Sequence, residues 1–78
     1  MKSTLELIQI AGIGVNLIID AKLKSTLDII QIVGSIGLKE SHITIKNANY
    51  KSTLDLIQIA SIYPKNITFD FTEIIKNE

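Results

Sequence analysis

A ten-residue segment occurs three times in this chain of 78 residues. It opens with Lys-Ser-Thr-Leu at Lys2, Lys24 and Lys51, and the copies start 22 and 27 residues apart. Each copy continues with an acidic residue, two apolar residues, Gln-Ile, and then Ala or Val. Self-similarity at a period of this size is the signature of repeat architectures. The sequence therefore predicts a single domain of three units, at about 2–23, 24–50 and 51–78.

Each copy carries the signals of a helix start. A serine stands three residues before an acidic residue, which is the spacing of a capping box, in the pairs Ser3 and Glu6, Ser25 and Asp28, and Ser52 and Asp55. In the first copy, apolar residues from Leu5 to Ala11 cover more than half of the helix circumference. Such a wide stripe predicts a helix that packs on a sheet and also against sister helices at its sides.

A β pattern follows each helix after a link that contains Gly or Pro. These patterns cover residues 15–23, 42–48 and 67–72. Strands joined through a helix run parallel, and such crossovers are right-handed in nearly all cases. The expected fold is α/β: a short right-handed solenoid of three helix–strand repeats, with a three-stranded parallel sheet and the helices on one face.

The facing of the strand residues follows from aligning the units. When counted back from the next Lys-Ser-Thr, Ile18 aligns with Ile45, so we expect both to face the helices together with Ile43, Ile67 and Phe69. The opposite face is then polar in the second and third strands but carries Leu17 and Ile19 in the first. An apolar outer face and open sheet edges invite another chain. Leu17 and Ile19 are therefore predicted to mediate self-association, with a two-fold homodimer favoured.

The units resemble those of small, poorly characterised bacterial proteins built from Lys-Ser-Thr-Leu-Asp-Leu-Ile-Gln-Ile-Ala repeats. In period and layout the whole chain is also similar to leucine-rich-repeat solenoids, although the Leu-x-x-Leu-x-Leu strand signature is missing. The first resemblance implies a fold without an established activity. The second implies a protein partner bound on a sheet or edge surface.

The residue types argue against catalysis and bound cofactors. The chain has no Cys, and its single histidine, His42, is expected to be a strand residue beside a loop. The Ser and Thr residues at the helix starts are explained as caps, and no acid cluster has the spacing of metal ligands. We expect no catalytic residue, cofactor or metal. A net charge of zero with eight Lys and no Arg also argues against nucleic acid as the partner.

Two further surfaces are candidates for binding. Parallel helix starts would align Lys2, Lys24 and Lys51 into an edge that could hold an anion or an acidic surface, although the neighbouring acids oppose this. The link after the second helix is the longest, and it is a candidate partner loop through its residues Ser35, Ile36, Leu38, Lys39 and Glu40.

These observations predict a non-enzymatic protein–protein interaction module that binds itself. It is expected in the cytoplasm and without a membrane span. It could also act on a larger host protein as a small inhibitor or adaptor, of the kind that phages encode. One alternative is a structural repeat protein whose end-to-end or edge assembly is its function. Another is a weak binder of nucleic acid or anions along the lysine edge.

Overall fold

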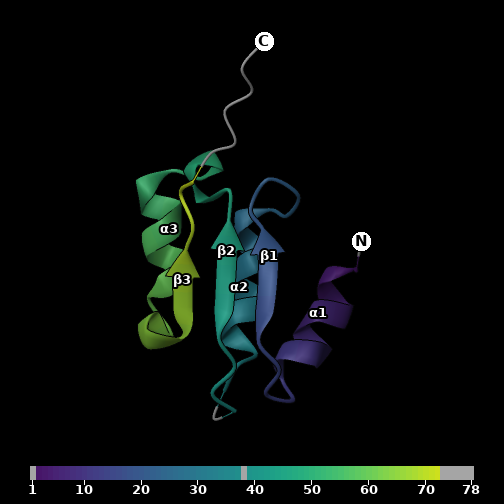
Figure 1. The fold of residues 1–78 in the computed structure, drawn as a ribbon. Helices are drawn as coiled ribbons and strands as arrows, with labels where there is room; N and C mark the ends of the chain where they lie inside the picture. Colours follow the sequence, from purple (N-terminus) through teal and green to yellow (C-terminus); the bar gives the residue numbers. More distant parts are fainter. Residues whose placement is uncertain (1, 38, 73–78) are drawn as a thin grey trace.

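Helices and strands alternate along the chain in the computed structural model, which describes residues 2–37 and 39–72 (Figure 1). In chain order the elements are α1 (Thr4–Ala11), β1 (Leu17–Asp20), α2 (Thr26–Gly34), β2 (Ile43–Lys46), the 3-10 helix η1 (Ala48–Tyr50), α3 (Thr53–Ala60), the 3-10 helix η2 (Pro64–Asn66) and β3 (Ile67–Phe69). Each of the three copies of the repeated segment forms one α-helix, and a strand follows each helix.

The strands form one parallel sheet in the order β1-β2-β3. The register pairs Leu17 with Ile43 and Ile43 with Ile67. In Figure 1 the helices lie behind the sheet, with α1 at one end of the row, α2 in the middle and α3 at the other end. Helix α2 packs against both α1 and α3. The α/β class and the parallel sheet predicted from the sequence are confirmed.

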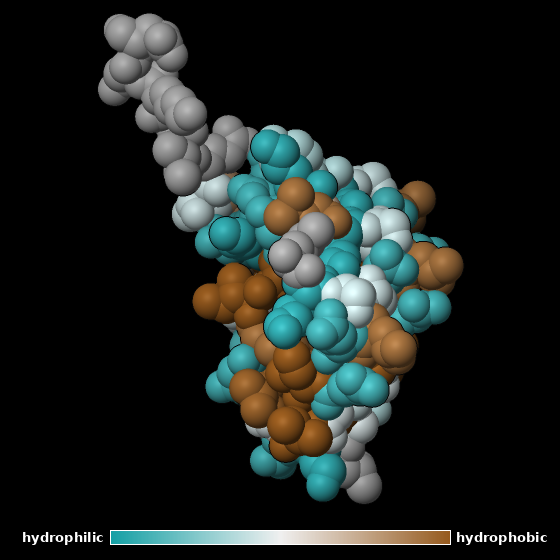
Figure 2. Space-filling model, turned by 90° about the vertical axis from the view of Figure 1, so that its right-hand side faces the viewer, coloured by the Kyte–Doolittle hydropathy of each residue, from teal (hydrophilic) through white to brown (hydrophobic). Residues whose placement is uncertain are grey.

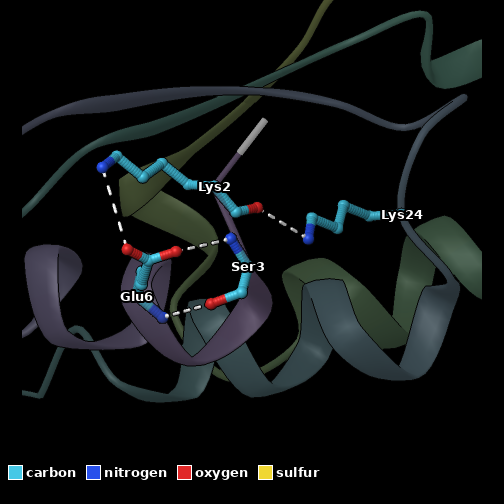
Figure 3. A network of polar contacts seen from close by, with 4 residues as sticks. All are labelled: Lys2, Ser3, Glu6 and Lys24. Atoms are coloured by element: carbon cyan, nitrogen blue, oxygen red, sulfur yellow. Dashed lines mark hydrogen bonds and ion pairs between the residues drawn. The ribbon is translucent and has the colours of Figure 1, made fainter.

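The serine caps fix where the helices begin. Ser3 Oγ accepts a hydrogen bond from the Glu6 amide, and Glu6 Oε1 accepts one from the Ser3 amide, which completes the capping box (Figure 3). In α2 and α3, Ser25 and Ser52 accept from the amides of Asp28 and Asp55. The serine cap predicted from the three-residue spacing is thus present in every copy, and the complete capping box is present in α1.

The predicted facing of β1 is wrong by one residue. Ile19 is 3% exposed and belongs to the core, whereas Ile18 is 74% exposed on the outer face of the sheet. The register pairs Ile19, not Ile18, with Ile45. Alignment from the next Lys-Ser-Thr fails because the link after β2 is one residue longer than the link after β1. Because side chains alternate between faces, this single residue reverses the assignment.

Asn47 occupies the start of that longer link, directly after β2. It has a φ of 56°, in the left-handed region that Asn tolerates better than most residues. Its side-chain Nδ2 donates to Asp20 Oδ1 at 2.8 Å, which ties the end of β2 to the end of β1. The extra residue therefore also fastens the first two strands together.

The core lies between the sheet and the helices. Its largest fully buried side chains include Ile29, Ile32, Ile43, Ile45 and Ile59. Leu5, which the wide helical stripe had placed among the packing residues, is instead exposed. The equivalent leucines of the other helices are exposed as well, so Leu5, Leu27 and Leu54 form a row on the outer surface of the helical layer.

Candidate interaction surfaces at the two ends of the sheet

One helical stripe is covered in the first two units and uncovered in the third. Its residues lie at the first, fifth and eighth positions of each helix, which share one side of an α-helix. In α2 these are Thr26, Ile30 and Val33; Val33 is fully buried and the other two are half-buried. The stripe of α1 is covered in the same way. In α3 the same side exposes Thr53, 59% of Ile57 and part of Ala60.

The opposite side of the helices shows the reverse pattern. Ile32 in α2 and Ile59 in α3 are fully buried, but the equivalent Ile10 in α1 is half-exposed. Leu7 is likewise more exposed than its fully buried equivalent Ile29. Within the described residues, no helix precedes α1 and none follows α3. The residue types are nearly the same in every unit, so the exposure depends on whether a neighbouring helix is present.

We call the open side of α1 and β1 the head face, with Leu7, Ile10, Ile18 and Leu23. The open side of α3 and β3 is the tail face, with Thr53, Ile57, Ala60 and the outer edge of β3. Figure 1 places the two faces at opposite ends of the row of units. Sequence reasoning predicted open sheet edges but did not identify these helical residues, because each has a less exposed counterpart of similar type in the repeat.

The head face contains a hollow of about 450 Å³ between α1 and β1. Its apolar lining consists of Leu7, Ile18, Ile19 and Leu23. Its charged lining consists of Lys2, Lys24, Lys46 and a single acid, Asp20. Figure 2 looks onto this end of the molecule and shows apolar side chains gathered there within a hydrophilic surround.

Both outer strands have main-chain groups directed away from the sheet. The Leu17 and Ala21 amides donate to the His42 and Lys46 carbonyls, so Leu17 and Ile19 turn their peptide groups toward β2. Because these groups alternate along a strand, those of Ile18 and Asp20 point to the outer edge of β1, where the Asp20 carbonyl accepts a hydrogen bond of 3.0 Å from the Leu23 amide. On the far strand, the Asp70 amide donates to the Ile45 carbonyl, which leaves the groups of Ile67 and Phe69 at the outer edge of β3.

A ladder of lysines joins the units at the helix starts. Lys24 Nζ donates to the Lys2 carbonyl oxygen at 3.0 Å (Figure 3) and to Thr4 Oγ1 at 3.2 Å. Lys51 Nζ donates to the Lys24 carbonyl oxygen at 2.8 Å. Lys2, at the head face, instead places its Nζ 3.8 Å from Glu6 Oε2. The predicted lysine edge exists, but its ammonium groups contact groups of the chain itself, so its geometry gives no support to an anion site.

One acidic residue of the helix starts, Asp55, also bonds to the preceding unit. Asp55 Oδ2 accepts a hydrogen bond of 3.1 Å from Thr26 Oγ1 of the preceding unit. Among the described residues, Glu6 bonds only within its own unit. Its hydrogen bonds with Ser3 lower the pKa of its carboxyl group. Each junction inside the chain thus combines an apolar stripe with a lysine and, between the second and third units, an acid.

The sequence-predicted self-association residues lie elsewhere than expected. Ile19 faces the helices and is buried, and Leu17 is half-buried on the same face and packs against the core. The surface prediction for this pair is therefore wrong, for the same reason as the facing of β1. The residue that replaces them on the outer face is Ile18.

The candidate partner loop is anchored more firmly than its length suggests. Ile36 is 1% exposed, and the Ser35 hydroxyl donates to the Ile32 carbonyl at 2.6 Å. Lys39 and Glu40 are exposed, and Leu38 lies outside the described residues. At the end of the link, the fully buried Ser41 donates from Oγ to the Ala11 carbonyl at 2.7 Å. Ile36 is thus part of the core rather than of the surface, and the partner role of this link remains a prediction.

The polar residues on the sheet make structural contacts. His42 Nε2 lies 2.6 Å from Thr68 Oγ1, and the His42 amide donates to Asn16 Oδ1 at 2.8 Å. Hydrogen bonds from Asn47 to Asp20 and from Thr72 to Asp70 lower the pKa of these two carboxyl groups. Among residues 2–37 and 39–72, no group of three or more His, Asp or Glu side chains is placed to hold a metal ion.

Comparisons with known proteins leave the geometry as the basis for assigning a function. No protein-family model matches the chain, and no match was found among curated proteins or among solved structures. Within the described part of the chain, every helix is too short or too polar to span a bilayer.

Proposed function

We propose that this protein is a non-enzymatic interaction module that binds other copies of itself through the two ends of its row of units. The units stack, in this proposal, as a short right-handed solenoid. The observation that carries the proposal is the exposure of Ile57 at the tail face, where the equivalent Ile8 and Ile30 pack against the core. The same residue type is partly buried where a following helix lies beside it and exposed where the described residues contain no following helix.

The size of the hydrophobic effect supports this reading. Complete burial of an Ile side chain contributes about 1.5–3 kcal/mol. Ile57 at the tail face, and Ile10 and Leu7 at the head face, therefore leave part of the available stabilisation unused in a single chain. The main-chain groups that Ile18 of β1 and Ile67 and Phe69 of β3 direct away from the sheet add to it, because exposed sheet edges promote pairing with another strand.

Sedimentation velocity from micromolar to millimolar concentration tests the proposal. We expect the weight-average mass to rise with concentration, and Ile57→Lys to abolish the rise because it would bury an unpaired charge in the contact. Leu54→Lys is the matched control, since Leu54 lies on the same helix but in the outer leucine row. A monomer throughout the range would overturn the proposal.

A further inference from the structure

We infer that copies of this chain join head to tail, so that the tail face of one copy receives the head face of the next and β3 of the first pairs in parallel with β1 of the second. The inference rests on the proposed self-association and specifies its partner surfaces. It replaces the two-fold dimer favoured from the sequence by an assembly whose contacts repeat those between the units of one chain.

The helical layer supplies the first argument. Inside the chain, the stripe of Thr26, Ile30 and Val33 on α2 packs toward the side of α3 that carries Asp55 and Ile59. The tail face presents the same stripe as Thr53, Ile57 and Ala60, and the head face presents the same receiving side through Glu6 and Ile10. A head-to-tail contact therefore brings together residue types that already pack against one another twice within the molecule.

The lysine ladder supplies the second argument. Lys24 and Lys51 each donate to the main-chain carbonyl of the equivalent lysine one unit earlier, which is Lys2 for Lys24 and Lys24 for Lys51. At one end of the ladder, Lys51 presents its main-chain carbonyl. At the other end, Lys2 presents its ammonium group, whose Nζ lies 3.8 Å from the exposed carboxylate of Glu6. A second copy in the same spacing would place its Lys2 beside the Lys51 carbonyl of the first. The acceptor is a main-chain group, so no new side chain is needed.

Strand pairing supplies the third argument. Between β2 and β3, the main-chain groups of Ile43 and Ile45 point toward β3, and those of Thr68 and Asp70 point toward β2. The register there pairs Ile43 with Ile67. At the ends, the main-chain groups of β3 that point away from the sheet belong to Ile67 and Phe69. Those of β1 belong to Ile18 and to the Asp20 amide, since the Asp20 carbonyl already accepts a hydrogen bond from the Leu23 amide. If Ile67 paired with Leu17 of the next copy, donors and acceptors would meet with the same one-residue offset as inside the sheet.

Charge argues against a two-fold contact between head faces. The hollow there is lined by three lysines and one aspartate. A two-fold axis would bring this surface against an identical one, and like charges in apposition are unfavourable. The stripe of Thr53, Ile57 and Ala60 on the tail face carries no charge, which makes it the compatible partner. A head-to-tail contact that does not close into a ring leads to open growth.

Two variants, each blocked at one face, test the inference. Ile10→Lys blocks the head face and Ile57→Lys blocks the tail face; Leu5→Lys and Leu54→Lys are controls on the same helices in the outer leucine row. Circular dichroism first establishes that all four fold. The Ile10→Lys protein is labelled with 15N so that native mass spectrometry separates the partners by mass, and each variant is measured alone and in a 1:1 mixture.

We expect each blocked variant alone to be a monomer, because every junction needs one intact face of each kind. The mixture should give a 1:1 heterodimer and no larger species, since the tail of the Ile10→Lys chain and the head of the Ile57→Lys chain remain intact. Both control variants should grow with concentration as the parent chain does.

Other outcomes would overturn the inference. If the parent chain associates but the mixture yields no heterodimer, the head-to-tail geometry is wrong while the proposed self-association stands. A homodimer of either blocked variant would indicate a two-fold contact through its remaining face and would also refute the inference. A monomeric parent chain would remove the proposed function and this inference together.

Discussion

The ammonium group of Lys51 donates a hydrogen bond of 2.8 Å to the main-chain carbonyl oxygen of Lys24, one unit earlier in the chain. Lys24 makes the same contact with Lys2 at 3.0 Å. The repeated lysine, which the sequence suggests as part of an anion site, thus connects consecutive units.

Replacing Lys51 measures the strength of this connection. Because the bond involves a charged donor and is partly buried, we expect Lys51→Met to lower the free energy of unfolding by about 1–2 kcal/mol. The exposed Lys65 gives the control, and Lys65→Met should change this free energy by less than about 0.5 kcal/mol. Urea denaturation at low micromolar concentration gives both values. Equal effects would show that the ladder contributes nothing specific.

The helix caps can be tested at Ser52. Ser52→Ala removes the acceptor for the Asp55 amide and should lower the free energy of unfolding by about 1 kcal/mol. Ser52→Asp restores a capping oxygen and should recover most of that loss. Thermal unfolding followed by circular dichroism compares the two variants. If Ser52→Asp is as unstable as Ser52→Ala, the hydroxyl acts by something other than capping.

Ile36 tests whether the long link belongs to the core. Its side chain is fully buried, so Ile36→Val should lower the free energy of unfolding by about 0.5–1.5 kcal/mol. Ile62→Val makes the same change at an exposed position and should have almost no effect. Urea denaturation measures both variants, and their midpoint concentrations are compared for curves with the same m value. An Ile36→Val variant as stable as the parent chain would show that this buried side chain contributes little to the stability of the fold.

Asn47 has two roles that separate variants can distinguish. Asn47→Gly keeps the left-handed backbone but loses the bond to Asp20, which should cost about 1 kcal/mol of unfolding free energy. Asn47→Ala also forces an L-residue with a Cβ into that conformation and should cost about 1 kcal/mol more. Equal stability of the two variants would show that the backbone conformation is not a constraint.

Stability should fall in acid. Hydrogen bonds lower the pKa values of Glu6, Asp20 and Asp70 in the folded protein. These groups therefore stabilise the fold above their ordinary pKa values, of about 4.3 for Glu and 3.9 for Asp, and the contribution is lost as the pH falls through the lower, folded values. Urea titrations between pH 7 and pH 3 measure the loss. Asp20→Asn should reduce its size, and an unchanged pH dependence would exclude a role for Asp20.

Local features were predictable from the sequence because they depend on neighbouring residues. A serine three residues before an acid gave the start of each helix, and links with Gly or Pro separated helices from strands. Which side chains of β1 face the helices was not predictable in the same way. Aligning the units by their strands gives one answer, and aligning them by the Lys-Ser-Thr segments gives the other. Asn47 adds one residue between these two reference points, and nothing in the sequence marks it as the insertion.

The end faces show a different limit. Ile8, Ile30 and Ile57 are the same residue at the same position of the repeat, so a pattern of residue types assigns them the same environment. Their exposure differs because only the first two have a following helix in the described structure. Leu5 illustrates the reverse case, in which an apolar residue within a wide stripe is exposed in every unit. Such differences follow from the arrangement of neighbours in space.

The lysine ladder has a consequence for how such a chain can change in length. Each contact requires a lysine in the later unit, whereas its acceptor is a peptide carbonyl that any residue of the earlier unit would provide. A tandem duplication in the gene that copied one whole unit would therefore bring its own donor and find an acceptor already present. The lysine contact therefore places no requirement on the side chains of the earlier unit when a unit is added or lost.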